Sequence, residues 1–243
     1  IDGVGVVVEV NAETDFVAKN ESFCEFVKGL LRTIIANKPA DVEALKSLAF
    51  DGTSATVDAA LTEKIAQIGE KISIRRFAVV EGTVATYIHG AGTTGVIVKF
   101  STGADVAGNA AFAEFAKNIA LQLAAGDPPQ YVSIEDVPAE AVAEEKAILI
   151  AQAKNDPKNA SKPDQILEKI ATGKLGKFYE ANCLTENAYV KDDSMTVAKY
   201  VESCAKAFGG SIKIDSFFRY EKGEGLQKRE DNLGDEIAKM LSK

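Results

Sequence analysis

Two apolar runs with nearly the same sequence occur about ninety positions apart in the chain. They are residues 5–10, Gly-Val-Val-Val-Glu-Val, and residues 95–100, Gly-Val-Ile-Val-Lys-Phe. Both runs alternate little and are rich in β-branched residues, which is typical of a strand that is buried on both faces or central in a sheet. Polar residues and then a helical pattern follow each run, so the sequence predicts the same strand and helix order twice.

The two predicted helices have matching apolar stripes, with large apolar residues at positions i, i+3, i+7 and i+11. These residues are Phe23, Phe26, Leu30 and Ile34 in the first helix and Phe112, Phe115, Ile119 and Leu123 in the second. Residues with this spacing lie on one face of a helix. We therefore expect each helix to pack one apolar face on a sheet.

The ends of the two units match as well, because each closes with a helix, a glycine and a strand. Thr56 opens a helix that stops at Gly69, and Thr196 opens one that stops near Gly209. Glycine at these positions supplies a left-handed C-cap. A chance likeness between two strand and helix units is the alternative, but the shared residues at both ends favour two related α+β modules.

A long insertion separates the first helix of the second module from its last strand. We expect one helix over residues 137–154, with Asp136 as N-cap and Pro138 in the first turn. A second helix is expected to start with a capping box of Ser161 and Asp164. Both apolar stripes are narrow, so the pair is predicted to project as an antiparallel, coiled-coil-like hairpin and not to form two core helices.

The predicted fold class is therefore α+β, with two duplicated modules of a small antiparallel sheet packed with helices. The inserted hairpin and a C-terminal amphipathic helix, which contains Leu233, Ile237 and Leu241, complete it. We expect a first subdomain over residues 1–90 and a second over 91–225, with the hairpin at about 136–178. Residues 226–243 form the expected C-terminal module.

Charge and cysteine content exclude several classes of protein. Acidic side chains outnumber basic ones by 36 to 28, and the net charge of −8 disfavours nucleic acid as a direct ligand. No apolar run approaches the ~20 residues of a membrane span, so we expect no membrane partner. Cys24, Cys183 and Cys204 form no C-x-x-C pair, so we interpret them as small buried hydrophobes and expect no metal site.

Candidate chemistry is sparse. His89 is the only histidine, and no candidate nucleophile is placed near it. Residues 90–95 fit the dinucleotide pattern G-x-G-x-x-G, but strands are predicted on both sides, and no helix N-terminus follows to hold a pyrophosphate. We interpret this segment as a β-hairpin turn, and we expect neither an enzyme nor a bound cofactor.

The most informative segment is residues 9–20, which contains Thr14-Asp15-Phe16-Val17. Alone, it predicts an N-cap at Thr14 or Asp15 followed by the start of an apolar helix face. As a whole, it resembles the T-D-F-V-A-K signature of the elongation factor Ts family. The resemblance continues over nearly the whole chain, at residues 64–76, 87–90, 173–178, 184–185, 189–190 and 218–225.

The resemblance implies a guanine-nucleotide exchange factor that binds elongation factor Tu, both GDP-bound and nucleotide-free, and promotes GDP release. In that family the Asp-Phe pair enters the partner's G domain near the magnesium and phosphate site, which requires an exposed ring at Phe16. The second module would reach the partner's third domain. The partner-binding residues that the resemblance implies are Thr14, Asp15, Phe16, Val17, Ile68, Gly69, His89 and Val190.

Two departures from the family pattern are expected: we expect the chain to act without the N-terminal helical domain with which the family normally begins, and Lys191 stands where we expect an apolar contact residue. Two other functions stay open at this point. One is a small-molecule enzyme that uses residues 90–95, and the other is a ribosome-associated or scaffold protein that kept the fold without exchange activity. The expected compartment is the cytoplasm or an organelle matrix, with the plastid stroma preferred over an animal-type mitochondrion because the hairpin is long.

Overall fold

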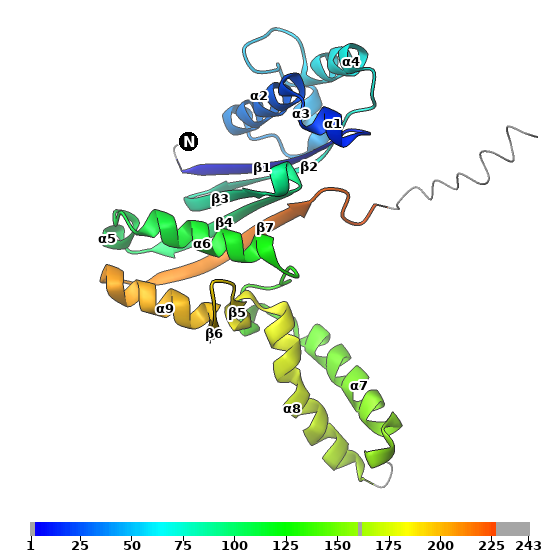
Figure 1. The fold of residues 1–243 in the computed structure, drawn as a ribbon, viewed down its shortest axis with the longest axis vertical. Coiled ribbons are helices and arrows are strands. Elements are labelled where there is room, and N and C mark those ends of the chain that lie inside the picture. The colour runs from blue at the N-terminus through cyan, green and yellow to red at the C-terminus, as the bar shows by residue number, and fades with distance from the viewer. Residues whose placement is uncertain (1–2, 160–161, 227–243) are drawn as a thin grey trace, which may run out of the picture.

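The two predicted strand and helix units fold as two modules whose sheets face each other (Figure 1). A computed structural model describes residues 3–159 and 162–226 of the chain. Over these residues the order of layers is helices, sheet, sheet, helices, and a helical hairpin projects from one end (Figure 1). The predicted α+β class is confirmed. The predicted C-terminal helix lies outside the described residues.

The first module pairs two antiparallel strands and covers them with four helices. Its elements are β1 (Val4–Asn11), α1 (Asp15–Ala18), α2 (Glu21–Asn37), α3 (Val42–Lys46), α4 (Val57–Ile68) and β2 (Ser73–Glu81). The predicted stripe of α2 packs on Val8 and Val10 of β1 and on Leu61 of α4. Thr56 caps the start of α4, and Gly69 ends it in the left-handed conformation, both as predicted.

The second module places three antiparallel strands in the order β3-β4-β7. Its elements are β3 (Thr83–His89), the 3-10 turn η1 (Gly90–Gly92), β4 (Thr94–Thr102), α5 (Ala104–Ala107), α6 (Phe112–Ala125), α9 (Val197–Phe208) and β7 (Ile212–Glu221). The predicted stripe of α6 packs on Phe100 of β4 and Ile214 of β7. Residues 90–95 join β3 to β4 as the predicted hairpin turn.

The inner faces of the two sheets pack directly on each other. Val7 of β1 and Val80 of β2 meet Ile97 of β4. The contact depends on Gly95, since a Cβ atom there would lie only 2.8 Å from a methyl carbon of Val7. Strand β1 is thus covered on both faces, by α2 and by the second sheet. Strand β4 is also buried on both faces, by α6 and by the first sheet, and it is in addition the central strand of its own sheet.

The helical hairpin consists of α7 (Ala139–Asn155) and α8 (Asp164–Asn182), joined through the short 3-10 turn η3 (Pro157–Asn159). It projects away from the sheets (Figure 1) and has a small core of its own, formed by Leu149, Ala171 and Leu175. The predicted projecting arm is confirmed. The structure places no helix among the described residues that is long and apolar enough to cross a membrane.

The predicted N-cap of the first hairpin helix is wrong. Asp136 ends the preceding 3-10 turn η2 (Ile134–Asp136), where its carboxylate accepts hydrogen bonds from Ser133. Pro138 forces the residue before it into an extended conformation, so α7 starts only after the proline, which occupies the N-cap position. In α8 the N-cap is Pro163, and the predicted capping residue Ser161 lies outside the described residues.

The remaining features of the described chain are a small β-hairpin and three cysteines. After the 3-10 turn η4 (Leu184–Glu186), strands β5 (Ala188–Tyr189) and β6 (Asp192–Thr196) pair in an antiparallel ladder. Cys183 is buried as predicted, whereas Cys24 and Cys204 are only partly buried, because each lies at the margin of its helix's apolar face. All three thiols are unpaired.

Candidate partner-binding surface

The short helix α1 presents one large aromatic ring to solvent. The side chain of Phe16 is 88% exposed, whereas the neighbouring Val17 is buried in the core of the first module. Thr14 is the N-cap, and its hydroxyl oxygen accepts a hydrogen bond from the Val17 backbone N–H at 3.4 Å. Val17 therefore fixes the turn from the core side while the adjacent ring of Phe16 points outward, as the family resemblance implies and not as the local pattern alone predicts.

Three hydrogen bonds fasten this turn to the residues that follow α4. The backbone N–H and the hydroxyl of Thr14 donate to the two carboxylate oxygens of Glu70 at 2.9 and 2.7 Å. In return, the backbone N–H of Lys71 donates to the Glu13 carboxylate at 3.3 Å. The structure thereby brings Ile68 and Gly69 next to the Phe16 turn.

Asp15 forms an ion pair with a lysine from the other end of the chain. The ammonium of Lys222, which follows β7, lies 2.7 Å from the carboxylate of Asp15. The hydrogen bond from Lys222 lowers the pKa of the Asp15 carboxyl below its ordinary value. Asp15 is therefore an anion at neutral pH, directly beside the exposed ring of Phe16.

A buried carboxylate supports this arrangement from inside. Glu9 of β1 is only 7% exposed, and it accepts hydrogen bonds from Arg75 at 2.9 Å, from Arg76 at 2.6 Å and from the Gly223 backbone N–H at 3.1 Å. Burial raises the pKa of Glu9, but these bonds and one from Asn11 outweigh that effect and leave the pKa below its ordinary value. Glu9 thus fixes the chain next to Lys222.

Sequence reasoning did not single out Glu9 or Lys222. A glutamate inside an otherwise apolar strand, with two adjacent arginines in a later strand, is the signal that points to the Glu9 network. No comparable signal exists for the Lys222 ion pair with Asp15, because the two residues are 207 positions apart.

His89 ends β3 on an exposed edge of the second module. Beside it, Ile88 is an apolar side chain with 63% of its surface exposed, and sequence reasoning missed it. Ile88 and Asp15 line one groove of about 470 Å³ that runs along β1 between α2 and the β3–β4 turn. The turn at Phe16 and the end of β3 therefore border a single largely apolar hollow.

Val190 belongs to a second surface, formed by the hairpin of β5 and β6, which lies on the far side of the sheets from α1 (Figure 1). It lies at the tip of the β5–β6 hairpin with 48% of its side chain exposed. The side-chain amide of Gln122 holds this tip: it donates to the Ala188 carbonyl at 3.1 Å and accepts from the Val190 N–H at 2.6 Å. Lys191 turns back and donates to Asn118 at 2.7 Å, which leaves Val190 as the apolar contact at the tip.

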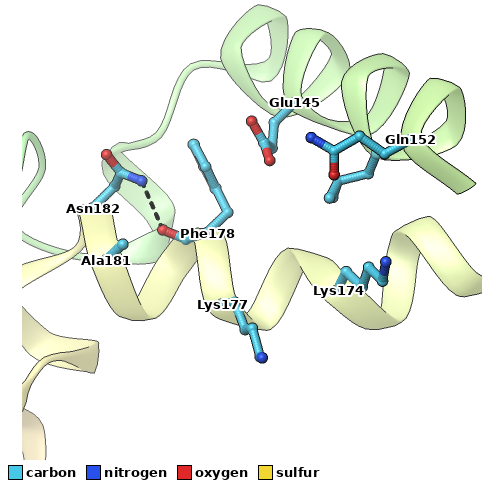
Figure 2. A pocket seen from close by; sticks show the side chains of 8 residues that line it. Glu145, Gln152, Lys174, Lys177, Phe178, Ala181 and Asn182 are labelled. Carbon is cyan, nitrogen blue, oxygen red and sulfur yellow. Dashed lines mark hydrogen bonds between the residues drawn. The ribbon is translucent and has the colours of Figure 1, made fainter.

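Figure 2 shows another hollow, of about 620 Å³, between the two helices of the arm. Phe178 points from α8 toward α7, whereas Lys177 points away from it (Figure 2). The side-chain amide of Asn182 donates to the Phe178 carbonyl of its own helix at 2.9 Å. None of the predicted partner-binding residues borders this hollow.

Metal and dinucleotide chemistry find no support in the part of the chain that the structure describes. Within residues 3–159 and 162–226 there is no group of three or more His, Cys, Asp or Glu side chains arranged to hold a metal ion. The G-x-G-x-x-G segment lies between two antiparallel strands, so it has no helix N-terminus at which a pyrophosphate could bind.

Comparisons with known proteins agree with the sequence pattern. A family model described as Elongation factor TS matches residues 13–224. A protein named Elongation factor Ts from Syntrophotalea carbinolica is 44% identical over 239 residues, covering 97% of this chain and 77% of the relative. A relative of the same name from Clostridioides difficile is 42% identical, and the match covers 98% of this chain and 76% of the relative. One from Clostridium botulinum is 40% identical, with 98% of this chain and 77% of the relative covered.

Proposed function

The chain belongs to the elongation factor Ts family, and from that premise we infer that it is a guanine-nucleotide exchange factor of translation elongation. Its partner is elongation factor Tu, from which it promotes the release of GDP. Nothing in the fold or in the comparisons favours a scaffold or ribosome-associated protein without exchange activity. Exchange breaks no covalent bond, so the activity belongs to binding energy and not to a catalytic acid or base.

We propose that the exposed turn of Asp15 and Phe16 is the part of the chain that acts on the nucleotide site of the partner. The observation that carries this proposal is the ring of Phe16, which is 88% exposed on a turn that is fixed by Val17 and Glu70. Burying a phenylalanine side chain contributes about 2 kcal/mol. A rigid ring that is buried only when the partner changes conformation favours that conformation by a similar amount.

The anion at Asp15 adds an electrostatic effect to this wedge. A carboxylate that enters a magnesium and phosphate site repels the phosphates and competes with them for the metal. Because nucleotide and exchange factor bind the same partner, the factor by which the chain weakens GDP binding equals the factor by which GDP weakens binding of the chain. We therefore propose that the chain binds both the GDP-bound and the nucleotide-free partner, the latter more tightly.

The remaining predicted residues extend the contact surface. Ile68 and Gly69 lie beside the Phe16 turn, and we propose that they meet the same domain of the partner as the ring does. Ile88, the residue before His89, lines the groove beside this turn, and we propose that His89 contacts the partner at the same edge. Val190 at the tip of the β5–β6 hairpin is proposed to contact the third domain of elongation factor Tu.

We propose that the chain acts in the cytoplasm, where bacterial translation elongation takes place. The three relatives compared above are bacterial proteins. The plastid stroma is the organelle alternative, because the long helical arm is kept.

The test is the release of fluorescently labelled GDP from purified elongation factor Tu in the presence of excess unlabelled nucleotide. We expect the intact chain to accelerate release at substoichiometric concentration, and Phe16→Ala to lower that acceleration about 30-fold. Phe218→Ala is the matched control, because Phe218 is also an exposed aromatic side chain but lies on β7, away from α1. No acceleration by the intact chain would overturn the proposed function.

A further inference from the structure

The backbone around Lys222 is held rigidly although its side chain reaches into solvent. Its own N–H donates to the Thr93 carbonyl at 2.8 Å, and the next N–H, that of Gly223, donates to the buried carboxylate of Glu9. One residue further on, Glu224 pairs with Arg76 at 2.9 Å. The base of the Lys222 side chain is therefore a fixed point attached to both sheets.

The helix that carries Asp15 and Phe16 needs such a fixed point. It has only four residues, far fewer than an isolated helix requires to persist in water. Contacts with other parts of the chain must hold it, and three of them are the packing of Val17 in the core of the first module, the bonds of Glu70 at the N-cap and the ion pair of Lys222 with Asp15. Of these three, only the contact with Lys222 comes from the second module.

The ion pair has little value for folding. Both side chains are more than half exposed, and exposed pairs of this kind contribute little to stability because water and salt screen them. The same contact fixes the direction of the residue directly before the Phe16 ring. Its effect should therefore appear in partner binding and not in unfolding.

We propose that Lys222 is a positioning residue for exchange: it holds Asp15, and through it the Phe16 turn, in the orientation that enters the partner. This inference rests on the proposed function and assigns a further residue to the same site. Ordering the turn before contact lowers the entropy lost on association, so it improves the apparent affinity for the partner. The maximal exchange rate, which depends on the ring and the carboxylate once they are in place, is unaffected.

The experiment compares exchange by the intact chain with exchange by Lys222→Met, Lys222→Arg, Asp15→Asn and the double variant Asp15→Asn/Lys222→Met. Labelled GDP release is measured over a range of factor concentrations, which separates the half-saturating concentration from the maximal rate. We expect Lys222→Met to raise the half-saturating concentration about two- to fivefold at an unchanged maximal rate. Lys222→Arg keeps the positive charge, so its half-saturating concentration should equal that of the intact chain.

The double variant separates positioning from direct contact. If Lys222 acts through Asp15, adding Lys222→Met to Asp15→Asn produces no further change; if it touches the partner itself, the two effects multiply. The inference would be overturned if the effects of the two substitutions on the half-saturating concentration multiplied, or if Lys222→Met had the same half-saturating concentration as the intact chain. Raising the salt concentration to about 0.5 M should also shrink the difference between the intact chain and Lys222→Met, since the pair is solvent-exposed.

Lys206→Met is the matched control, because Lys206 forms an equally exposed ion pair with Glu202 at 2.8 Å on α9, remote from α1. Its half-saturating concentration should equal that of the intact chain. Failure of this inference is distinguishable from failure of the proposed function: in the first case the intact chain still accelerates GDP release, and in the second it does not.

Discussion

Two four-residue helices, α1 and α5, occupy matching places after the repeated strands of the two modules. Each is anchored by a valine, Val17 with 9% and Val106 with 0% of its surface exposed. The residue before the valine differs: it is Phe16 in the first module and Asp105 in the second. The comparison shows that packing keeps a valine at the buried position, whereas the position next to it differs between the copies; the binding role that we propose for Phe16 therefore concerns the first copy alone.

The two turns are also fastened in different ways. In the first module, Thr14 and Glu70 join by two hydrogen bonds. The matching positions in the second module are Gly103 and Gly210, which have no side-chain oxygen. A Cβ atom at Gly210 would lie 2.6 Å from a methyl carbon of Val106, so that turn is held by close packing. The turn with the exposed ring is thus the one with polar fastening at its surface.

The bulged strands β1 and β4 differ at one matching position. Both ladders shift register at the same point, after Glu9 in β1 and after Lys99 in β4. Glu9 is buried and paired with two arginines, whereas Lys99 has no ion pair among the described residues. The first module therefore depends on a buried charge where the second does not.

The largest expected effect comes from removing that charge. Glu9→Gln should lower the free energy of unfolding by about 2 to 4 kcal/mol, because Arg75 and Arg76 lose their counter-charge in a partly buried site. Lys99→Gln should change it by no more than about 0.5 kcal/mol. Urea denaturation of both variants measures the difference. Equal effects would show that the modules do not differ at this point.

The pH dependence of stability sharpens the same comparison. The pKa of Glu9 is lower in the folded chain than in the unfolded one, so its contribution is fully present above the unfolded value of about 4.5. It is lost as the pH falls through the folded value. We expect the gap in unfolding free energy between the intact chain and Glu9→Gln to be constant above about pH 4.5 and to shrink as the pH falls below it, as measured by urea denaturation at each pH. A gap that grows on acidification would contradict this assignment.

An exchange of residues between the two short helices comes next in size. Phe16→Asp puts the residue of the second module into the first, and we expect GDP release to slow by about 30- to 100-fold because the ring is lost. The unfolding temperature should hardly change, since Phe16 makes few contacts within the chain. Asp105→Phe should leave exchange unaltered. A large effect of the second substitution would mean that both turns touch the partner.

The valine anchors should show a smaller effect, and mainly on stability. Val106→Ala is expected to cost about 2 kcal/mol and Val17→Ala about 1 kcal/mol, because Val106 is the more completely buried. Only Val17→Ala should also slow exchange, since it loosens the turn that presents Phe16. Thermal unfolding and labelled GDP release on the same preparations separate the two outcomes, and equal loss of exchange in both variants would refute the distinction.

The smallest pair of effects concerns the two helix C-caps. Gly69 and Gly209 both have φ near 79°, and a Cβ atom at either would meet nothing within 4 Å, so alanine introduces backbone strain alone. Each substitution should lower stability by about 1 kcal/mol. Gly69→Ala should in addition weaken exchange, because Gly69 lies beside the Phe16 turn, and Gly209→Ala should not. Identical exchange rates for the two variants would remove Gly69 from the proposed surface.

Much of the fold follows from local patterns. The caps Thr56 and Gly69, the apolar faces of α2 and α6 and the projecting arm were all predictable, because helix caps and apolar periodicity depend on neighbours within a few positions. The N-cap at Asp136 was mispredicted because a 3-10 turn and the start of an α-helix favour the same residue types, so the local pattern does not distinguish them. The repeated strand in two copies also indicated two related modules.

The sequence by itself determined the duplicated α+β plan, the family resemblance and the candidate turn at Phe16. Only the tertiary structure decided that the two sheets face each other, that Glu9 lies between Arg75 and Arg76, and that Lys222 reaches Asp15. The physical reason is that an apolar stripe encodes its own orientation within one element, whereas the partner of a charged side chain depends on the path of the whole chain. A lysine near the C-terminal end contains no local sign that it will meet an aspartate near the start.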